Sequence, residues 1–285
     1  MNKKIISYIE LARLDKPIGI YLLLWPSLLG LLLGGIQSGT VNVKNYLIVI
    51  IGSILVRSCG CVINDISDSK IDKQVERTLN RPLANGSISI IEAWSFFIIL
   101  SILSVSLLIF TNTLTVKISL FFALLIMLYP LTKRFFKAPQ FILGITFGSG
   151  SLIAYSLQSS VFSLSLAILY LGIIAWIVSF DTYYAMEDKD DDLKINVNST
   201  AILWGNNAVK YAQILHIFFY ISLFLVAIIN EFSLYFYSVF VGLLILFIRQ
   251  KKLVKEHKFI ECFKINNWIG ILAVLSFSLQ IFYLS

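Results

Sequence analysis

Long apolar segments alternate along this chain with short polar ones. Each apolar segment is close to the length of about 20 residues that an α-helix needs to cross a bilayer. Within the segments the apolar residues are continuous and lack the alternation of transmembrane β-strands. The pattern therefore predicts an all-α, polytopic membrane protein built as a bundle of nine transmembrane helices. The predicted spans cover residues 18–36, 44–64, 91–110, 114–132, 141–158, 161–182, 208–229, 232–249 and 267–284.

The segment ahead of the first span, residues 1–16, has a different pattern. Ile5, Ile6, Ile9 and Leu14 supply apolar positions between charged ones. This pattern predicts a short amphipathic helix that lies on the membrane surface.

The composition supports a membrane protein. Of the 285 residues, 58% are hydrophobic and 14% are charged, whereas a soluble domain carries about 25% charged residues. We expect one membrane-embedded domain, residues 1–285. Two acidic stretches lie four spans apart, and each follows an even-numbered span. This spacing is consistent with an ancient duplication of a four-helix unit, with a ninth helix added.

Nearly all basic residues fall on one side of the predicted bundle. If the amino terminus is cytoplasmic, Lys44 and Lys117 are the only lysine or arginine residues on the opposite side. This positive-inside distribution predicts that the amino terminus and both acidic stretches face the cytoplasm. The three cysteines and two histidines have no zinc or disulfide spacing, which argues against a histidine-based metal site or base.

The first acidic stretch follows the second span. If the helix continues through it, each residue turns by about 100°, so Asn64, Asp68 and Asp72 share one face and Asp65 lies at its edge. An amide and three carboxylates would then gather at the membrane edge. Carboxylates on one face repel each other, by about 4 kcal/mol for a pair 4 Å apart in a medium of intermediate dielectric. A bound cation would relieve that repulsion.

The second acidic stretch follows the sixth span. On a continuous helix Asp181, Asp188 and Asp192 fall within about 40° of one another. Oxygen-only ligands suit Mg²⁺, which binds few carboxylates, several waters and phosphate oxygens. An EF-hand is excluded because Leu193 stands where the calcium loop requires glycine and Ser199 where it requires glutamate. The two faces predict magnesium ions that hold a diphosphate, although a solvated loop is the plainer interpretation of either stretch alone.

Basic side chains accompany both acidic stretches. As a group they fit the capture of a diphosphate, whereas the positive-inside rule is enough to explain each one singly. They are Lys70, Lys73, Arg77, Arg81, Lys133, Arg134, Lys189 and Lys194.

Several short motifs stand out along nearly the whole chain. They comprise Arg13-Leu14-Asp15-Lys16-Pro17-Ile18-Gly19, Leu24-Trp25-Pro26, Asn64-Asp65-x-x-Asp68-x-x-x-Asp72, Asn80-Arg81-Pro82-Leu83, Tyr129-Pro130-x-x-Lys133-Arg134, Asp181-Thr182-x-Tyr184-Ala185, Asp188-x-Asp190-Asp191-Asp192 and Asn266-Asn267-Trp268. Together they resemble the motifs of the UbiA family of intramembrane aromatic prenyltransferases.

The resemblance implies an activity and a location. It implies Mg²⁺-dependent transfer of a polyprenyl group from polyprenyl diphosphate to the ring carbon of 4-hydroxybenzoate ortho to its phenol, a step of ubiquinone biosynthesis. It also implies a nine-helix bundle in a bacterial inner membrane, with the site open to the cytoplasm. Neither a nucleic acid nor an obligatory protein partner is expected.

The resemblance, together with the helix geometry of the acidic faces, suggests roles for the acidic stretches. Asp68 and Asp188 are expected to act in catalysis through metal ions. Asp191, about 80° off the metal-facing side, is a candidate for accepting the proton lost from the ring. The expected metal ligands are Asn64, Asp65, Asp68, Asp72, Asp181, Asp188 and Asp192. The expected substrate-binding residues are Arg13, Arg57, Lys73, Arg77, Tyr129, Lys133, Arg134, Lys189 and Lys194.

The carboxylate of the aromatic acid needs a cation. Arg57 lies seven residues before Asn64, on the same helix face and deeper in the membrane, where an arginine is a functional candidate. A structural pair with an acid or with backbone carbonyls explains Arg57 equally well. Arg13 and Arg134 are alternatives for the same role.

Other functions also fit parts of the pattern. Within the family, the acceptor could instead be a naphthoate, a homogentisate or a haem vinyl group. A cation-coupled transporter would use the acids as an ion path, but transporter sites lie near the middle of the bilayer and these acids cluster at one edge. A scaffold that binds prenyl diphosphate without reaction is the third alternative. The prenyl length stays open.

Overall fold

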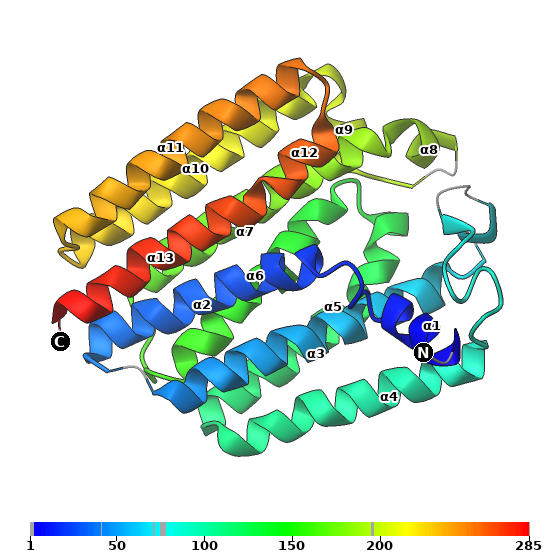
Figure 1. Ribbon diagram of the computed structural model, residues 1–285, viewed down its shortest axis with the longest axis horizontal. Helices are drawn as coiled ribbons and strands as arrows, with labels where there is room; N and C mark the ends of the chain where they lie inside the picture. Colours follow the sequence, from blue (N-terminus) through cyan, green and yellow to red (C-terminus); the bar gives the residue numbers. More distant parts are fainter. Residues whose placement is uncertain (1–2, 41, 71, 75–77, 195–196, 285) are drawn as a thin grey trace.

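The protein is a bundle of long helices (Figure 1). The computed structural model describes residues 3–40, 42–70, 72–74, 78–194 and 197–284, and every regular element in these residues is a helix. The long helices are α2 (Ile18–Ser38), α3 (Val43–Asp68), α4 (Ile90–Ser106), α5 (Thr113–Phe135), α6 (Pro139–Ser156), α7 (Leu164–Glu187), α10 (Ala208–Ile229), α11 (Leu234–Lys255) and α13 (Asn266–Leu284). The short ones are α1 (Lys3–Leu11), α8 (Lys189–Lys194), α9 (Thr200–Leu203) and α12 (Phe259–Lys264), with 3-10 turns η1 (Asp72–Gln74), η3 (Leu107–Phe110) and η4 (Gly205–Asn207).

The all-α, multi-helix prediction is confirmed. In the described part of the chain, the long helices correspond one by one to the nine predicted spans. Seven segments are long and apolar enough to cross a membrane. The two remaining helices are α5, whose apolar part is the shorter Thr113–Tyr129, and α6, which has 18 residues.

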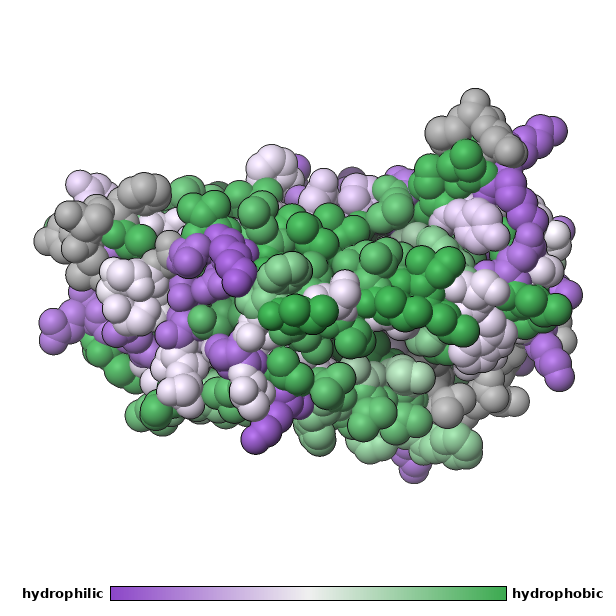
Figure 2. All heavy atoms as spheres, turned by 90° about the horizontal axis from the view of Figure 1, so that it is seen from below, coloured by the Kyte–Doolittle hydropathy of each residue, from purple (hydrophilic) through white to green (hydrophobic). Residues whose placement is uncertain are grey.

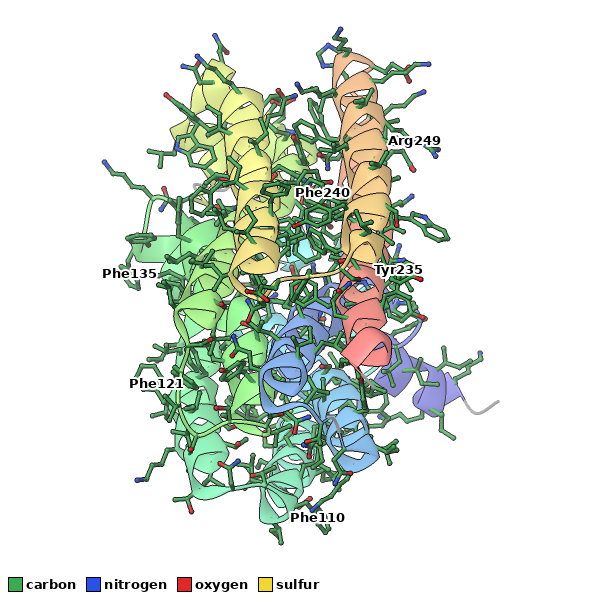
Figure 3. The ribbon with its side chains drawn as sticks, turned by 90° about the vertical axis from the view of Figure 1, so that its left-hand side faces the viewer. Phe110, Phe121, Phe135, Tyr235, Phe240 and Arg249 are labelled. Carbon is green, nitrogen blue, oxygen red and sulfur yellow. The ribbon has the colours of Figure 1, made fainter. Side chains whose placement is uncertain are left out.

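The surface of the bundle matches a lipid environment. Phe110, Phe121 and Phe135 are more than half exposed, and they lie on the outside of the helices in Figure 3. Figure 2 shows hydrophobic side chains over the middle of one face, with hydrophilic side chains concentrated toward its left and right ends. An apolar middle with polar ends is the pattern that a bilayer imposes on an integral membrane protein.

Helix ends are set by capping side chains. The Asn42 and Asn112 side chains accept hydrogen bonds from backbone amides in the first turns of α3 and α5. Ser89 and Glu92 form a reciprocal capping box at the start of α4. These contacts satisfy amide groups that the helix itself leaves without partners.

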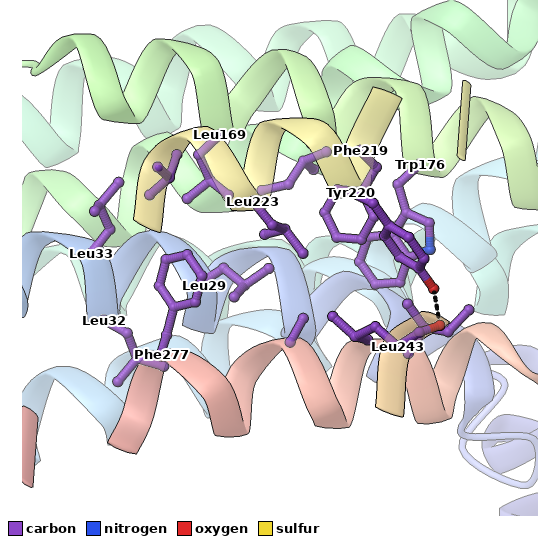
Figure 4. Close-up of a cluster of buried hydrophobic side chains, with 14 of the residues drawn as sticks. Leu29, Leu32, Leu33, Leu169, Trp176, Phe219, Tyr220, Leu223, Leu243 and Phe277 are labelled. Carbon is purple, nitrogen blue, oxygen red and sulfur yellow. Dashed lines mark hydrogen bonds between the residues drawn. The ribbon is translucent and has the colours of Figure 1, made fainter. Parts of the chain in front are cut away.

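The largest buried cluster lies where α2, α7, α10 and α13 meet (Figure 4). The rings of Trp176 and Phe219 stack with centroids 4.7 Å apart. The Tyr220 hydroxyl donates to the Leu243 carbonyl oxygen at 2.9 Å, and Trp176 Nε1 donates to Asn266 Oδ1 at 2.8 Å. Because lipid is as apolar as these side chains, close packing and hydrogen bonds between helices hold the bundle together.

A close approach of α2 to α6 depends on a glycine. A Cβ atom at Gly30 would collide with the backbone of Ser151. Small residues at such positions let helix backbones approach within a membrane. This contact fixes α2 and α6, which both carry side chains into the cavities described below.

The predicted amphipathic helix, α1, packs at one end of the bundle beside α3 and α4 (Figure 1). Lys4 Nζ lies 2.6 Å from Glu92 Oε1, and the rings of Tyr8 and Phe96 meet edge to face at 5.0 Å. Leu11 is fully buried, whereas Ile5 is half exposed. These contacts hold α1 against the bundle and so position the turn that follows it, which contains Arg13, near the end of α3.

Candidate functional site

A polar cavity of about 740 Å³ lies at the end of the bundle where α1 packs. It is lined by residues of α1, α2, α3, α5, α6, α7, α8 and α12 and of the segments between helices. Asn64 and Asp65 of the first acidic stretch line it, and so do Asp181, Asp188 and Asp192 of the second. The fold thus brings the two distant stretches to one cavity.

Asp65 is almost fully buried and is bonded to two arginines. Arg13 Nη2 donates to both carboxylate oxygens of Asp65, at 3.1 and 2.9 Å. Arg81 Nη1 lies 3.2 Å from Asp65 Oδ1 and 2.8 Å from Asp72 Oδ2. Asp65 is 2% exposed, so these contacts offset the cost of removing its charge from water. Both oxygens of this predicted metal ligand are engaged by guanidinium groups.

Arg13 adopts an unusual backbone conformation to reach Asp65. Its φ angle is 57°, in the left-handed region that residues other than glycine seldom occupy. Its Nη1 donates to the Glu10 carbonyl oxygen at 2.8 Å. Strained conformations of this kind persist where surrounding contacts determine them, and here the contacts are those with Glu10 and Asp65.

The expectation of a helix that continues through Asp72 is wrong. The helix α3 ends at Asp68, and Asp72 begins the separate turn η1. The Asp72 carboxylate pairs with Arg81, and the Thr78 hydroxyl donates to the Asp72 carbonyl oxygen at 2.8 Å. Burial works against the charge of Arg81, but the carboxylates of Asp65 and Asp72 raise its pKa. The ion pair and the hydrogen bond therefore hold Asp72 in place, although it is not part of α3.

The second stretch is also divided. The helix α7 ends at Glu187, Asp188 is its C-terminal capping residue, and α8 follows at once. The Asp192 amide donates to the Asp188 carbonyl oxygen at 2.9 Å, which turns the chain so that both side chains line the cavity. Beyond it, the Thr200 amide donates to Gln140 Oε1 at 2.9 Å and anchors this segment to α6.

Arg57 projects from α3 into the cavity wall. The guanidinium carbon lies 5.2 Å from the centre of the Phe147 ring, and the buried Nε has no hydrogen-bond partner among the described residues. Tyr129 lies near enough to Asp68, Asp181 and Arg57 to experience their charges. Arg57 and Tyr129 both line the cavity, so these two predicted substrate-binding residues share it with the acids.

Other predicted residues are placed differently. Among the described residues, Asp68, Asp72, Lys73, Lys189 and Lys194 do not line the cavity. Arg77 lies outside the described residues, as do the side chains of Lys133, Arg134 and Asp191. Roles for these residues stay predictions.

Sequence reasoning overlooked several cavity residues. These are Lys16, Gly19, Asn80, Gln140, Phe147, Phe180, Tyr184, Phe263 and Lys264, together with the bridging role of Arg81. The sequence motifs that contain Arg13 and Arg81 also include Lys16, Gly19 and Asn80, so these three residues could have been predicted. Lys264 and Phe263 come from α12, a short helix after the eighth span, where only the three-dimensional fold brings the chain back to the site.

The donor atoms in the cavity suit a hard cation. They are carboxylate and amide oxygens, the ligands that Mg²⁺ prefers. Within the described ranges, no group of three acidic, histidine or cysteine side chains is arranged to hold a metal ion by itself. Mg²⁺ usually keeps several waters and takes substrate phosphate oxygens as ligands, so the residues present fit an ion that binds together with a phosphorylated substrate.

An apolar cavity of about 290 Å³ adjoins the polar one. Leu23, Val56, Ile126 and Thr146 line both cavities. Its walls come from α2 to α6 and include small residues such as Gly52. The hydroxyl groups of Ser27, Thr146 and Ser149 in its wall donate to backbone carbonyls of their own helices, as Thr146 does to Ile142 at 2.9 Å. The cavity therefore presents a mostly apolar surface to an occupant.

The fold and the cavities define a class of protein. It is an integral membrane bundle of helices with a cavity at one end that is lined by acidic and basic side chains, and a second, apolar cavity extends from it among the helices. The UbiA prenyltransferase family matches residues 23–283. The chain belongs to the UbiA prenyltransferase family.

Relatives in this family match nearly the whole chain. The 4-hydroxybenzoate octaprenyltransferase of Saccharophagus degradans is 39% identical, and the match covers 96% of this chain and 92% of that protein. The 4-hydroxybenzoate octaprenyltransferase of Pasteurella multocida is 39% identical, with 99% and 98% covered.

Solved structures share the fold. A UbiA homologue from Aeropyrum pernix K1 has a TM-score of 0.79 at 21% identity, and the match covers 90% of this chain and 96% of that one. A UbiA homologue from Archaeoglobus fulgidus bound to GPP and Mg²⁺ has a TM-score of 0.68 at 18% identity, with 98% of both chains covered.

The contacts of Asp65 lead to a stability prediction. Replacement by Asp65→Ala leaves two arginines facing each other without their shared carboxylate. A fully buried pair would lose about 3–5 kcal/mol. Arg13 and Arg81 keep about a fifth of their side-chain surface exposed, so we expect a loss of about 2 kcal/mol.

Chemical denaturation of the purified protein in detergent measures this loss. The control is Asp190→Asn, which removes an exposed acidic charge of the second stretch. Equal stability of Asp65→Ala and the control would show that the ion pairs do not support the fold.

Proposed function

We propose that the protein transfers an all-trans polyprenyl group from polyprenyl diphosphate to the ring carbon of 4-hydroxybenzoate ortho to its phenol, with release of diphosphate. The observation that carries this proposal is the junction of a charged cavity with an apolar one. A prenyl diphosphate has the same division into a charged head and an apolar tail. Relatives of nearly equal length named 4-hydroxybenzoate octaprenyltransferase support the acceptor and the donor class.

The diphosphate is proposed to bind between the two acidic stretches. Asn64 of the first stretch and Asp188 and Asp192 of the second line the cavity and carry oxygen ligands of the kind that Mg²⁺ binds. Bound Mg²⁺ would supply positive charge for the departing diphosphate oxygens. The UbiA homologue from Archaeoglobus fulgidus bound to GPP and Mg²⁺ supports this assignment. Asp68 is proposed to act with them, since it lies one helical turn beyond Asn64 on α3.

The prenyl tail is proposed to occupy the apolar cavity. The cavity follows α3 from Ile63 to Ile48, a distance of about 22 Å at 1.5 Å per residue. Exposed side chains of Val105, Leu120 and Met127 lie in its wall. A tail longer than the cavity could therefore continue between α4 and α5 into the lipid.

The aromatic acceptor is proposed to place its carboxylate near Arg57. Arg13 is engaged by Asp65 and by the Glu10 carbonyl oxygen. Among the described residues, Arg57 forms no ion pair and its buried Nε has no hydrogen-bond partner. An isolated cation at this depth is stabilised by an anionic ligand. Arg134 stays an alternative on the sequence prediction alone.

Aromatic side chains of the cavity are proposed to protect the reacting centre. Phe147, Phe180, Tyr184 and Phe263 line it, and the rings of Tyr184 and Phe263 meet at 5.1 Å. Ring faces attract the positive charge that develops on an allylic carbon as diphosphate leaves. Exclusion of water by the same rings would limit hydrolysis. The ring carbon of the acceptor then attacks, and Asp191 is proposed to accept the released proton.

The proposed location is the bacterial inner membrane, with the cavity on the cytoplasmic side. The distribution of lysine and arginine supports this orientation. Water-soluble 4-hydroxybenzoate would then enter from the cytoplasm, and the donor would enter from the bilayer.

The function is tested by the conversion of labelled 4-hydroxybenzoate to a lipid-soluble product in membranes that contain the protein, Mg²⁺ and octaprenyl diphosphate. We expect product that disappears with EDTA. The variant Asp188→Asn should lower the rate by about 100-fold or more, because it removes charge that positions the metal. The matched control Asp190→Asn alters an exposed acid outside the cavity wall and should retain activity. Absence of product from folded protein with several donor lengths would reject the proposal.

The tail assignment predicts a change in donor preference. A Cβ at Gly52 would meet only Leu107, at 3.9 Å, so Gly52→Leu should fold and fill part of the apolar cavity. We expect kcat/KM for octaprenyl diphosphate to fall at least about tenfold relative to geranyl diphosphate, because the long tail loses its space while the short one does not. An unchanged ratio would place the tail elsewhere.

A further inference from the structure

Arg57 and Gly19 meet where α2 begins beside α3. A Cβ atom added to Gly19 would lie 2.7 Å from Arg57 Nε, 2.8 Å from Nη2 and 3.0 Å from Cζ. All three atoms belong to the flat guanidinium group. The guanidinium therefore lies against the backbone of Gly19, in space that any other residue would fill with its side chain.

The opposite helix supplies a second surface for the same group. Phe147 of α6 holds its ring centre 5.2 Å from the guanidinium carbon. Arg57, Gly19 and Phe147 all line the polar cavity. Contacts from two helices restrict how the guanidinium can rotate, and a restricted planar group binds a carboxylate with less loss of entropy than a mobile one.

Three other described cations that line the cavity are paired with carboxylates. Arg13 and Arg81 are bonded to Asp65, and Lys264 Nζ lies 3.0 Å from Glu261 Oε1. Lys16 is exposed at the rim. Arg57 differs in that it lies deeper, with a buried donor that no described residue accepts.

We propose that Gly19 is a positioning residue for the acceptor: its missing side chain lets Arg57 lie flat between α2 and Phe147, with its N–H groups directed to the carboxylate of the aromatic acid. The inference rests on the proposed function and adds a determinant of acceptor specificity to it. Gly19 acts through Arg57 and need not touch either substrate.

The test is Gly19→Ala, whose methyl group forces the guanidinium out of its place. Two quantities are measured: KM for 4-hydroxybenzoate and the inhibition constant of 4-hydroxybenzamide, a neutral molecule of the same shape. KM for the acid should rise about tenfold, the size expected for the loss of one charge-assisted hydrogen bond. The inhibition constant of the amide, KM for the prenyl donor and kcat should each change less than about twofold.

The matched control is Gly60→Ala. Gly60 lies one turn after Arg57 on α3, and a Cβ there would meet no atom within 4 Å. It adds the same methyl group without displacing Arg57, so KM for the acid should stay within about twofold of the wild type. An equal rise in both variants would mean that cavity volume matters rather than the placement of Arg57, and the inference would be overturned.

A double-variant comparison separates positioning from a general structural effect. In an Arg57→Ala background, Gly19→Ala should have no further effect on KM for the acid, because no guanidinium remains to displace. The same tenfold rise in both backgrounds would overturn the inference. If Gly19→Ala does not fold, Phe147→Leu removes the second surface and should raise KM for the acid while sparing the amide; equal effects on both ligands would again overturn it.

Failure of this inference differs from failure of the proposed function. Wild-type protein that forms no product from 4-hydroxybenzoate would reject the function itself. Product from the wild type, with the KM for the acid unaltered in Gly19→Ala, would reject only the role of Gly19.

Discussion

The buried carboxylate of Asp65 is the contact on which the polar end of the structure depends. It holds Arg13, which precedes α2, and Arg81, which follows the turn at Asp72. One side chain of α3 thus joins three segments that would otherwise be separate at the membrane edge. Both arginines offset the cost of burying its charge, and the loss of either would leave that charge less well compensated in a poorly solvated place. The three side chains line the polar cavity, and Arg13 makes its contact with Asp65 from a left-handed backbone conformation.

The same network divides the charged residues by role. Arginines at the end of the bundle are bound to carboxylates of the first stretch, whereas Arg57 lies deeper and faces Gly19 and Phe147. Asn64 of the first stretch and Asp188 and Asp192 of the second line the same cavity. A charged cavity joined to an apolar one matches the charged head and apolar tail of a prenyl diphosphate. The arginine beside it matches the carboxylate of an aromatic acid.

The sequence predicted the spans and the convergence of the acidic stretches but not the local geometry at their ends. Hydrophobic length located every long helix, because lipid requires a closed backbone hydrogen-bond pattern over about 20 residues. It placed the end of the second span at Asn64, whereas α3 continues to Asp68, since polar residues can extend a helix beyond the membrane. The position of the Asp72 side chain depends on its ion pair with Arg81, and that of Asp65 depends on Arg13, which is 52 residues away in the sequence. Helical periodicity contains no information on such distant ion pairs, nor on the empty space at Gly19 that Arg57 fills.

The central claim, that both acidic stretches serve one metal–diphosphate site, is tested most directly by Mn²⁺ binding. Mn²⁺ replaces Mg²⁺ at oxygen sites and is detected by electron paramagnetic resonance. Purified protein should bind Mn²⁺ in the presence of inorganic diphosphate, and Asn64→Ala and Asp188→Asn should each weaken that binding by about tenfold or more. Binding that either variant leaves unchanged would contradict a site shared by the two stretches.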